Sequence, residues 1–269
     1  MMNDLKVGII GCGNMGLALI RGLLKNRFIA PKRLIAWDLE KKILSRVVRV
    51  YGIQGVGSNA EVAQAKIVLL AVKPQQMEQV LQEIQFHLRH RPLLISIAAG
   101  IPIGWIEKRV GRSIPVVRVM PNTPALVGAG ISAIAPGRAA KAKDLHVAKR
   151  IFACVGEVVE VPEKWMNSVT AVSGSGPAYF FFLMEQMIRA GVSLGLPSEV
   201  ARRLVLGTAT GAARLANISG EEPALLRSRV TSKGGTTEAA FRLFAQKDLG
   251  GILKRGIRAA AIRAKELTH

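Results

Sequence analysis

Short apolar runs alternate with longer amphipathic segments through the first half of the chain. Five uninterrupted apolar runs predict buried strands, at residues 5–10, 34–37, 67–72, 93–97 and 116–120. Segments with helical spacing predict helices between them, at residues 14–25, 39–50 and 75–88. Apolar strands that alternate with helices indicate a parallel sheet covered on both faces. Two later runs predict strands that extend this sheet at its edge, at residues 131–135 and 157–161.

The pattern changes after Pro162, because no later run has the composition of a strand. Segments rich in Ala, Leu and Arg predict helices instead, at residues 179–194, 198–215, 223–229, 237–246 and 251–267. The predicted fold is therefore α/β. It has a Rossmann-like, doubly wound parallel sheet over residues 1–162 and an all-helical C-terminal domain over residues 163–269.

A glycine-rich turn, GCGNMG at residues 11–16, follows the first predicted strand and opens the first predicted helix. In this context the glycines allow a tight turn, close approach of the backbone to a pyrophosphate, and close helix–strand packing. The turn predicts a dinucleotide site that includes Gly11, Gly13, Asn14, Met15 and Gly16. A glycine-rich turn without a ligand is the alternative, and the strand–turn–helix context favours the ligand.

Asp38 ends the second predicted strand, about 20 residues after the glycines. An acidic residue there usually accepts a hydrogen bond from the ribose 2′-hydroxyl and favours NAD over NADP. Lys41, Lys42 and Asn59 are alternative neighbours for a 2′-phosphate. The sequence therefore leaves NADP(H) and NAD(H) both open as the cofactor.

The carboxyl ends of later strands carry further candidates, because open α/β sheets bind ligands at this edge. Lys73 follows the third predicted strand, and we expect it to lie near the cofactor. The loop RVMPNTP at residues 118–124 is made rigid by two prolines, which can hold Asn122 and Thr123 toward the nicotinamide. A rigid turn in which Asn122 has a capping role explains this loop equally well.

The loop TSKGGTT at residues 231–237 is the most informative stretch of the second half. Two adjacent glycines leave the backbone N–H groups accessible, and four hydroxyl side chains flank them. A helical pattern resumes directly afterwards, and the N-terminus of a helix favours an anion such as a small carboxylate. An ordinary helix cap needs only one hydroxyl and one glycine, so the composition favours a ligand site.

Composition narrows the function. The chain has 38 Lys and Arg against 18 Asp and Glu, a formal net charge of +20. The basic residues are spread along the sequence without interleaved aromatic residues, so we do not expect nucleic acid as the primary partner. The charge instead indicates a surface that attracts anionic ligands. No apolar stretch approaches the ~20 residues of a membrane span, and we expect no membrane partner.

Cysteine and histidine usage excludes several chemistries. Cys12 and Cys154 are far apart and belong to no ligand cluster, so we predict no metal site and no disulfide. With no signal-peptide pattern at the start, we expect a cytoplasmic protein. The four histidines, at positions 87, 90, 146 and 269, lie outside every motif, and we expect them at the surface. A reaction without a histidine acid is indicated, and hydride addition to a C=N bond meets that condition.

Five motifs occur in order along the chain: GCGNMG (11–16), VKP (72–74), RVMPNTP (118–124), SGSGPAY (173–179) and VTSKGGTT (230–237). With these motifs the chain resembles the pyrroline-5-carboxylate reductase family over residues 5–266. The resemblance implies reduction of 1-pyrroline-5-carboxylate to L-proline by NAD(P)H, as part of proline biosynthesis. It also implies that the helical domain forms a homodimer or a ring of dimers, with each active site shared between subunits.

The resemblance assigns residues as well. The cofactor is expected against Asn59, Val72, Lys73 and Pro74. The substrate carboxylate is expected at a second set: Ser232, Gly234, Gly235, Thr236 and Thr237. Thr237 is the implied catalytic residue, hydrogen-bonded near the ring nitrogen.

Two departures from the family pattern stand out. Lys233 replaces a proline that many relatives carry, which adds positive charge beside the carboxylate site. Asp38 is unusual among NADPH-preferring relatives. Alternatives are a reductase of a related cyclic imino acid and a β-hydroxyacid-type dehydrogenase. The second needs a lysine on the long interdomain helix, where residues 179–194 contain Arg189 but no lysine.

Overall fold

The computed structural model describes residues 5–267, which fall into two compact units. The first unit runs to Ser175 and also includes the residues from Ala260 onward, and the second is Gly176–Ala259. In the described part of the chain, every strand belongs to the first unit. The domain boundary expected after residue 162 stays a prediction: the last strand ends at Glu160, whereas the first unit continues to Ser175.

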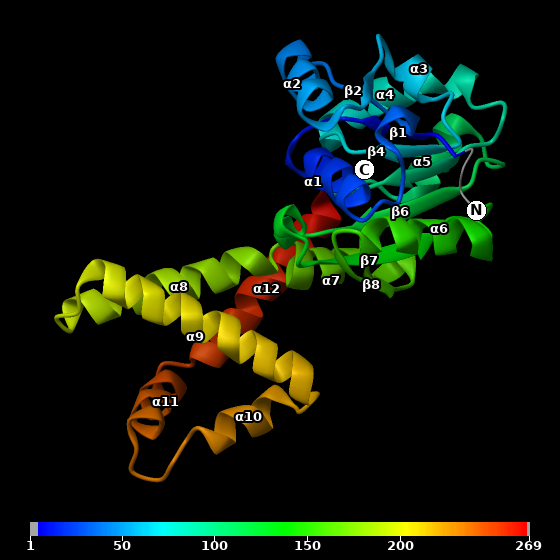
Figure 1. Cartoon of the computed structure of the whole chain (residues 1–269). Coiled ribbons are helices and arrows are strands. Elements are labelled where there is room, and N and C mark those ends of the chain that lie inside the picture. The colour runs from blue at the N-terminus through cyan, green and yellow to red at the C-terminus, as the bar shows by residue number, and fades with distance from the viewer. Residues whose placement is uncertain (1–4, 268–269) are drawn as a thin grey trace. The chain divides into compact units, whose positions relative to one another are not determined.

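The strands form one eight-stranded sheet in the order β3-β2-β1-β4-β5-β6-β7-β8 (Figure 1). Their bounds are Val7–Ile10 (β1), Leu34–Trp37 (β2), Gln54–Gly55 (β3), Ile67–Leu70 (β4), Leu93–Ser96 (β5), Val116–Met120 (β6), Gly130–Pro136 (β7) and Gly156–Glu160 (β8). The first six strands are parallel, and the chain reverses direction across the sheet after β3. This arrangement confirms the predicted doubly wound α/β fold.

Strand β7 runs antiparallel to the first six strands, which the sequence did not predict. It pairs antiparallel with β6, with Val119 opposite Ile134. Only residues 121–129 join the two strands, fewer than the dozen or so that a helical crossover requires, so the chain folds straight back. Helix α6 then crosses over, and β8 lies parallel to β7. Both strands extend the sheet at its edge, as predicted.

The first unit has seven helices among its described residues before the chain enters the second unit. They are α1 (Asn14–Lys25), α2 (Lys41–Tyr51), α3 (Asn59–Val62), α4 (Met77–Ile84), α5 (Ile103–Val110), α6 (Ala142–Ala153) and α7 (Met166–Val169). Helices α1, α2 and α4 occupy the segments predicted to be helical. The sequence analysis missed α3, α5, α6 and α7, although α5 has buried apolar positions at Ile103, Ile106 and Val110 that repeat with helical spacing.

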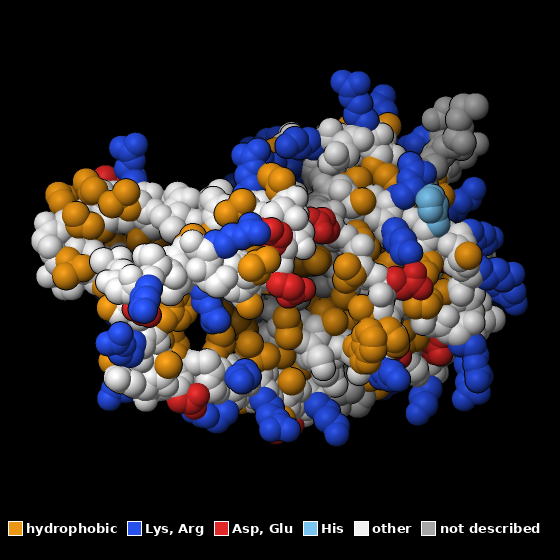
Figure 2. Space-filling view, turned by 90° about the horizontal axis from the view of Figure 1, so that it is seen from below, with side chains coloured by type: hydrophobic (Ala, Val, Ile, Leu, Met, Phe, Trp, Pro, Cys, Tyr) orange, Lys and Arg blue, Asp and Glu red, His pale blue; other side chains and the backbone are white. Residues whose placement is uncertain are grey.

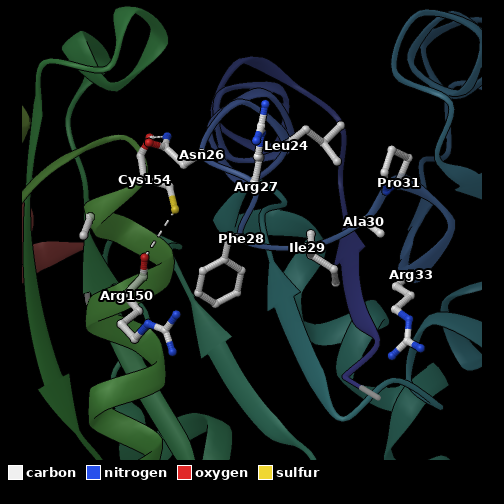
Figure 3. Close-up of a pocket in the computed structure, with 11 residues that line it drawn as sticks. Leu24, Asn26, Arg27, Phe28, Ile29, Ala30, Pro31, Arg33, Arg150 and Cys154 are labelled. Carbon is white, nitrogen blue, oxygen red and sulfur yellow. Dashed lines mark hydrogen bonds between the residues drawn. The ribbon is translucent and has the colours of Figure 1, made fainter. Parts of the chain in front are cut away.

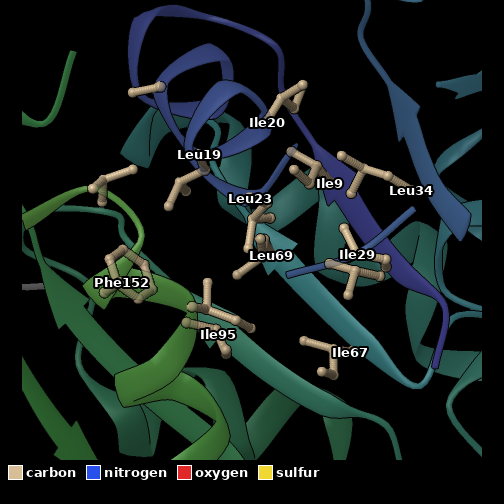
Figure 4. Close-up of a cluster of buried hydrophobic side chains, with 14 of the residues drawn as sticks. Ile9, Leu19, Ile20, Leu23, Ile29, Leu34, Ile67, Leu69, Ile95 and Phe152 are labelled. Atoms are coloured by element: carbon tan, nitrogen blue, oxygen red, sulfur yellow. The ribbon is translucent and has the colours of Figure 1, made fainter. Parts of the chain in front are cut away.

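Each face of the sheet carries its own buried layer. Leu69 of β4 packs on one face with Leu19 and Leu23 of α1 and Phe152 of α6 (Figure 4). The alternate residue Val68 points to the other face, in a layer with side chains from α4 and α5. Successive side chains of a strand point to opposite faces, so a strand covered on both sides needs apolar residues at every position.

The second unit is helical, as predicted. Its helices are α8 (Gly176–Ser193), α9 (Ser198–Ser219), α10 (Pro223–Arg229), α11 (Thr236–Gln246) and α12 (Leu249–Glu266), the last ending within the first unit. Helices α8 and α9 lie side by side (Figure 1). A Cβ on Gly191 would lie 3.2 Å from Cβ of Ala201, so the glycine permits their close packing.

Little of the second unit is buried within one chain. Among its described residues, Gly176, Ala201 and Val205 are the buried ones. Phe180, Phe181 and Phe182 are each more than 60% exposed. Figure 2 shows hydrophobic groups interspersed with basic side chains on one face of the molecule. So much exposed apolar surface is typical of an interface with another protein chain.

Two phenylalanines offer a matched test of the first unit's core. Phe152 is fully buried, whereas Phe86 is 75% exposed. Phe152→Ala should lower the free energy of unfolding by about 3–5 kcal/mol, because it removes buried contacts and leaves a cavity. Phe86→Ala should change it by less than about 0.5 kcal/mol. Urea titrations followed by circular dichroism compare the two, and equal losses would contradict the assigned core.

Candidate functional site

The predicted glycine turn lies between β1 and α1, and its three glycines have different reasons to be glycine. Gly11 has φ 97°, and a Cβ there would lie 2.6 Å from the backbone oxygen of Ala71. A Cβ on Gly16 would collide with the backbone oxygen of Gly11. Gly13 differs, because a Cβ there would meet nothing within 4 Å. The fold therefore requires Gly11 and Gly16, whereas Gly13 leaves open space beside the turn.

A pocket of about 400 Å³ lies at the carboxyl edge of the sheet, beside this turn. It brings together six predicted cofactor residues: Gly11, Gly13, Asp38, Asn59, Val72 and Lys73. The lining also includes residues that the sequence analysis missed: Trp37, Leu39, Glu40, Ile43, Ala71, Gln76, Gln79 and Val80. Most of them follow β2 or β4 directly or lie in the next helical turns, so the carboxyl-edge rule contained the signal for them.

The remaining predicted cofactor residues do not line this pocket. Asn14, Met15 and Gly16 form the first turn of α1, and Pro74 opens the 3-10 turn before α4. Asn122 follows β6, and its side-chain oxygen accepts a hydrogen bond from the backbone N–H of Ile131 at 3.0 Å. That bond joins the ends of β6 and β7 and favours the structural role of Asn122, whose contact with the nicotinamide stays a prediction.

Asp38 is bound to the turn by its side chain. One carboxylate oxygen accepts a hydrogen bond from the backbone N–H of Cys12 at 2.6 Å, and the other accepts one from Glu40 at 2.8 Å. The Cys12 side chain is only 3% exposed. Burial, with a smaller contribution from Asp38, raises the pKa of the Cys12 thiol to about 12. The carboxylate thus has a fixed position at the wall of the pocket.

Asn59 lies at the start of α3 and is 2% exposed. Its side-chain nitrogen donates a hydrogen bond to Glu83 at 2.7 Å, and Glu83 also accepts one from Gln79 at 2.9 Å. The Asn59 Oδ1 atom has no hydrogen-bond partner in the part of the chain that the structure describes. A buried polar atom without a partner is costly, so this oxygen is available for a ligand in the pocket that Asn59 lines.

Arg118 of the RVMPNTP loop is part of the fold's interior. It is 3% exposed on β6, and its guanidinium pairs with Glu163 at 3.3 Å. Burial lowers the Arg118 pKa, and the Glu163 carboxylate partly offsets that effect. Glu163 also accepts a hydrogen bond from the Ile103 N–H at 2.6 Å, at the start of α5. Arg118 and Glu163 therefore join β6, α5 and the segment after β8.

The predicted substrate loop lies at the N-terminus of α11 in the second unit, where the sequence placed the start of a helix. Gly234 has φ 75°, and its N–H donates to the Glu238 carboxylate at 2.7 Å. The first helical bond runs from Ala239 N–H to Gly235 O at 3.2 Å, so the amides of Thr236 and Thr237 precede the hydrogen-bonded ladder. The N-cap residue is Gly235, and no side chain caps this helix.

A second hollow, of about 1000 Å³, lies at the turn between α1 and β2 and the last turn of α6 (Figure 3). Arg27, Arg33 and Arg150 line it, but their guanidinium groups point in different directions. The Cys154 thiol donates to the backbone oxygen of Arg150 at 3.4 Å. None of the predicted site residues lies here, and the arginines form no common anion-binding point.

Among the described residues, no group of three or more His, Cys, Asp or Glu side chains is arranged to hold a metal ion. No helix within residues 5–267 is long and apolar enough to cross a membrane. His87, His90 and His146 are exposed, as predicted, and His269 lies outside the described residues.

The glycine turn, the open space at Gly13 and the unpaired Asn59 oxygen fit a dinucleotide, so fold and pocket define a dinucleotide-binding α/β protein with a helical second unit. Two family models match: "NADP oxidoreductase coenzyme F420-dependent" over residues 6–100, and "Pyrroline-5-carboxylate reductase dimerisation" over residues 163–267. Full-length relatives extend this match along the whole chain. The chain belongs to the pyrroline-5-carboxylate reductase family.

The relatives are similar over their full length. Pyrroline-5-carboxylate reductase of Pseudomonas aeruginosa is 42% identical, with 100% of this chain and 98% of the relative aligned. The solved reductase of Coxiella burnetii has a TM-score of 0.93 and 35% identity, covering 99% of this chain and 100% of that one. The Plasmodium falciparum enzyme, solved with NADP bound, has a TM-score of 0.91 and 32% identity, with 100% of both chains covered.

Gly13 provides the first test of the pocket. Gly13→Val should abolish dinucleotide binding and leave the fold intact, because a side chain there fills open space that the pyrophosphate needs. Titration with NADH and NADPH, followed by fluorescence of Trp37, measures binding. Gly104→Val is the control, since Gly104 in α5 is equally open but lies away from the pocket. Unchanged affinity in Gly13→Val would show that the turn does not hold the dinucleotide.

Proposed function

We propose that the protein reduces 1-pyrroline-5-carboxylate to L-proline, with NADPH or NADH as the hydride donor. Full-length membership of the reductase family carries the proposal. It is supported by two separate features of this chain: a pocket suited to a dinucleotide and a loop suited to a small carboxylate. This activity places the protein in proline biosynthesis.

The loop before α11 would bind the substrate carboxylate. Its donors are the backbone amides at the helix N-terminus, supplemented by the hydroxyls of Ser232, Thr236 and Thr237. The Glu238 carboxylate already accepts a hydrogen bond from Gly234 in this loop, which supports its suitability for carboxylates. Gly235 lies close to Ser232, since a Cβ at Gly235 would lie 2.5 Å from the Ser232 hydroxyl oxygen. Lys233 is exposed and adds positive charge beside the site.

The reaction makes modest demands on the side chains. The bound cofactor supplies a hydride to the carbon of the C=N bond. A protonated ring nitrogen needs no histidine acid, which agrees with the exposed positions of His87, His90 and His146. We assign Thr237 as the catalytic residue, with its hydroxyl hydrogen-bonded at the ring nitrogen, where charge changes during hydride transfer. The Lys73 ammonium would bind the cofactor from the β4 side of the glycine turn, opposite Asp38.

We further propose a homodimer or a ring of dimers in the cytoplasm. The dimerisation model matches residues 163–267, and the second unit exposes large apolar side chains such as Phe181 and Leu204. A second copy of the chain would cover this surface, and we propose that each active site is shared between the two copies.

A steady-state assay tests the activity directly. Purified protein mixed with 1-pyrroline-5-carboxylate should oxidise NADH or NADPH, which lowers absorbance at the reduced-nicotinamide band, and L-proline should accumulate in equal amount. Light scattering on the same sample should give a mass above that of the 28.9 kDa chain. Folded protein that oxidises neither cofactor would refute the proposed function.

Thr237→Ala should reduce kcat/KM by about 5- to 150-fold, the effect of losing a hydrogen bond worth about 1–3 kcal/mol in the transition state. Its melting temperature should stay unchanged, because no side chain caps α11. The control is Thr231→Ala, since the Thr231 hydroxyl donates to the backbone oxygen of Arg227 at 2.7 Å. That variant should lose stability and keep kcat/KM. A destabilised Thr237→Ala with normal kcat/KM would assign Thr237 a structural role.

A further inference from the structure

The wall of the nucleotide pocket at the end of β2 is acidic. Asp38 and Glu40 both line the pocket there. The two Asp38 oxygens each accept one backbone hydrogen bond, so the turn fixes the carboxylate rather than neutralising it. An ionised carboxylate offers about four lone-pair positions, and two of them remain for a ligand. This wall can accept hydrogen bonds from a ligand hydroxyl.

Asn59 also presents an acceptor. A carboxylate only accepts hydrogen bonds, so Glu83 requires the amide nitrogen of Asn59 to face it. Glu83 is itself held by Gln79, another residue of the pocket lining. The Asn59 oxygen, which lacks a partner in the described residues, is therefore the amide atom left for the ligand. Glu83 acts here as a positioning residue.

The basic residues nearby do not offset these acceptors. Lys41 and Lys42 line a different hollow, together with Arg46 and Arg49 on α2. Lys73 lines the pocket but follows β4, and β1 lies between β4 and β2 in the sheet. Two strand spacings separate the backbones near Asp38 and Lys73 by about 10 Å. Lys73 and Asp38 therefore enter the pocket from opposite sides of the glycine turn.

We infer that this pocket selects NAD(H) over NADP(H), through Asp38 and through Asn59 held by Glu83. The inference rests on the proposed dinucleotide binding. A free ribose 2′-hydroxyl donates a hydrogen bond to these acceptors. A 2′-phosphate at the same place carries a charge of about −1.5 to −2 and offers mainly acceptor oxygens. At this wall it meets the Asp38 and Glu40 carboxylates, which repel it and offer only further acceptors.

Binding of ADP-ribose and of 2′-phospho-ADP-ribose tests the inference without any catalysis. Trp37 lines the pocket, so its fluorescence reports occupancy by either compound. The protein should bind ADP-ribose about 10- to 150-fold more tightly, the range expected for one hydrogen bond to a charged group. Added salt should reduce this difference in affinity, because it screens the repulsion between the 2′-phosphate and the carboxylates. Equal affinity, tighter binding of the 2′-phosphate compound, or no binding of either would overturn the inference.

Three substitutions locate the effect. Asp38→Asn removes the charge but keeps an oxygen acceptor for the turn, and should reduce the preference for ADP-ribose about tenfold. Glu83→Gln should also reduce it, because a neutral amide allows Asn59 to present its nitrogen to the ligand. Glu157→Gln on β8 removes the same charge outside the pocket and should leave the preference unchanged. A preference that persists in Asp38→Asn would refute the role of Asp38.

The proposed function and the inferred cofactor preference can fail independently of each other. Protein that binds ADP-ribose selectively but does not reduce 1-pyrroline-5-carboxylate would refute the function and leave the inference standing. Protein that produces L-proline while preferring the 2′-phosphate compound would refute the inference and leave the function standing.

Discussion

The contact between the β1–α1 turn and its neighbours is the constraint on which the nucleotide pocket depends. Gly11 lies against the backbone of Ala71, and Gly16 lies against the backbone of Gly11, so side chains at either position would separate α1 from the sheet. The hydrogen bond from Cys12 N–H to Asp38 fixes the same turn from the side of β2. These contacts bring the ends of three neighbouring strands to one pocket, so packing within the core and the shape of the site have a common origin.

The sequence predicted the sheet and six residues of the pocket because both depend on local patterns. Apolar runs located the strands, and the carboxyl-edge rule placed Asp38 and Lys73 in the same pocket, where the structure has them. The sequence analysis missed the reversal of β7. The direction of a strand depends on the length of the connection before it, and the end of this connection is hard to locate in an apolar stretch. The Asn59–Glu83 contact joins residues 24 positions apart, and no local pattern indicates it.

In the second unit, the sequence predicts the helices but not which of their surfaces are exposed. Its helices follow from composition, and the start of α11 was predicted from the glycines and hydroxyls of the loop. The number of side chains left exposed along α8 and α9 depends on which surfaces meet, which helical periodicity does not specify. A helical unit that buries so few residues of its own depends on other surfaces for stability. Its fold and its assembly are therefore coupled properties.

The position of Cys12 has a consequence for chemical durability. The thiolate is the form of cysteine that reacts with oxidants and electrophiles, and a pKa raised to about 12 keeps the Cys12 thiol protonated at pH 7. Its 3% exposure also limits the access of reagents from solvent. A cysteine can thus occupy the centre of a nucleotide-binding turn without making that turn a target for peroxide. The same burial that tightens the turn protects it from covalent damage.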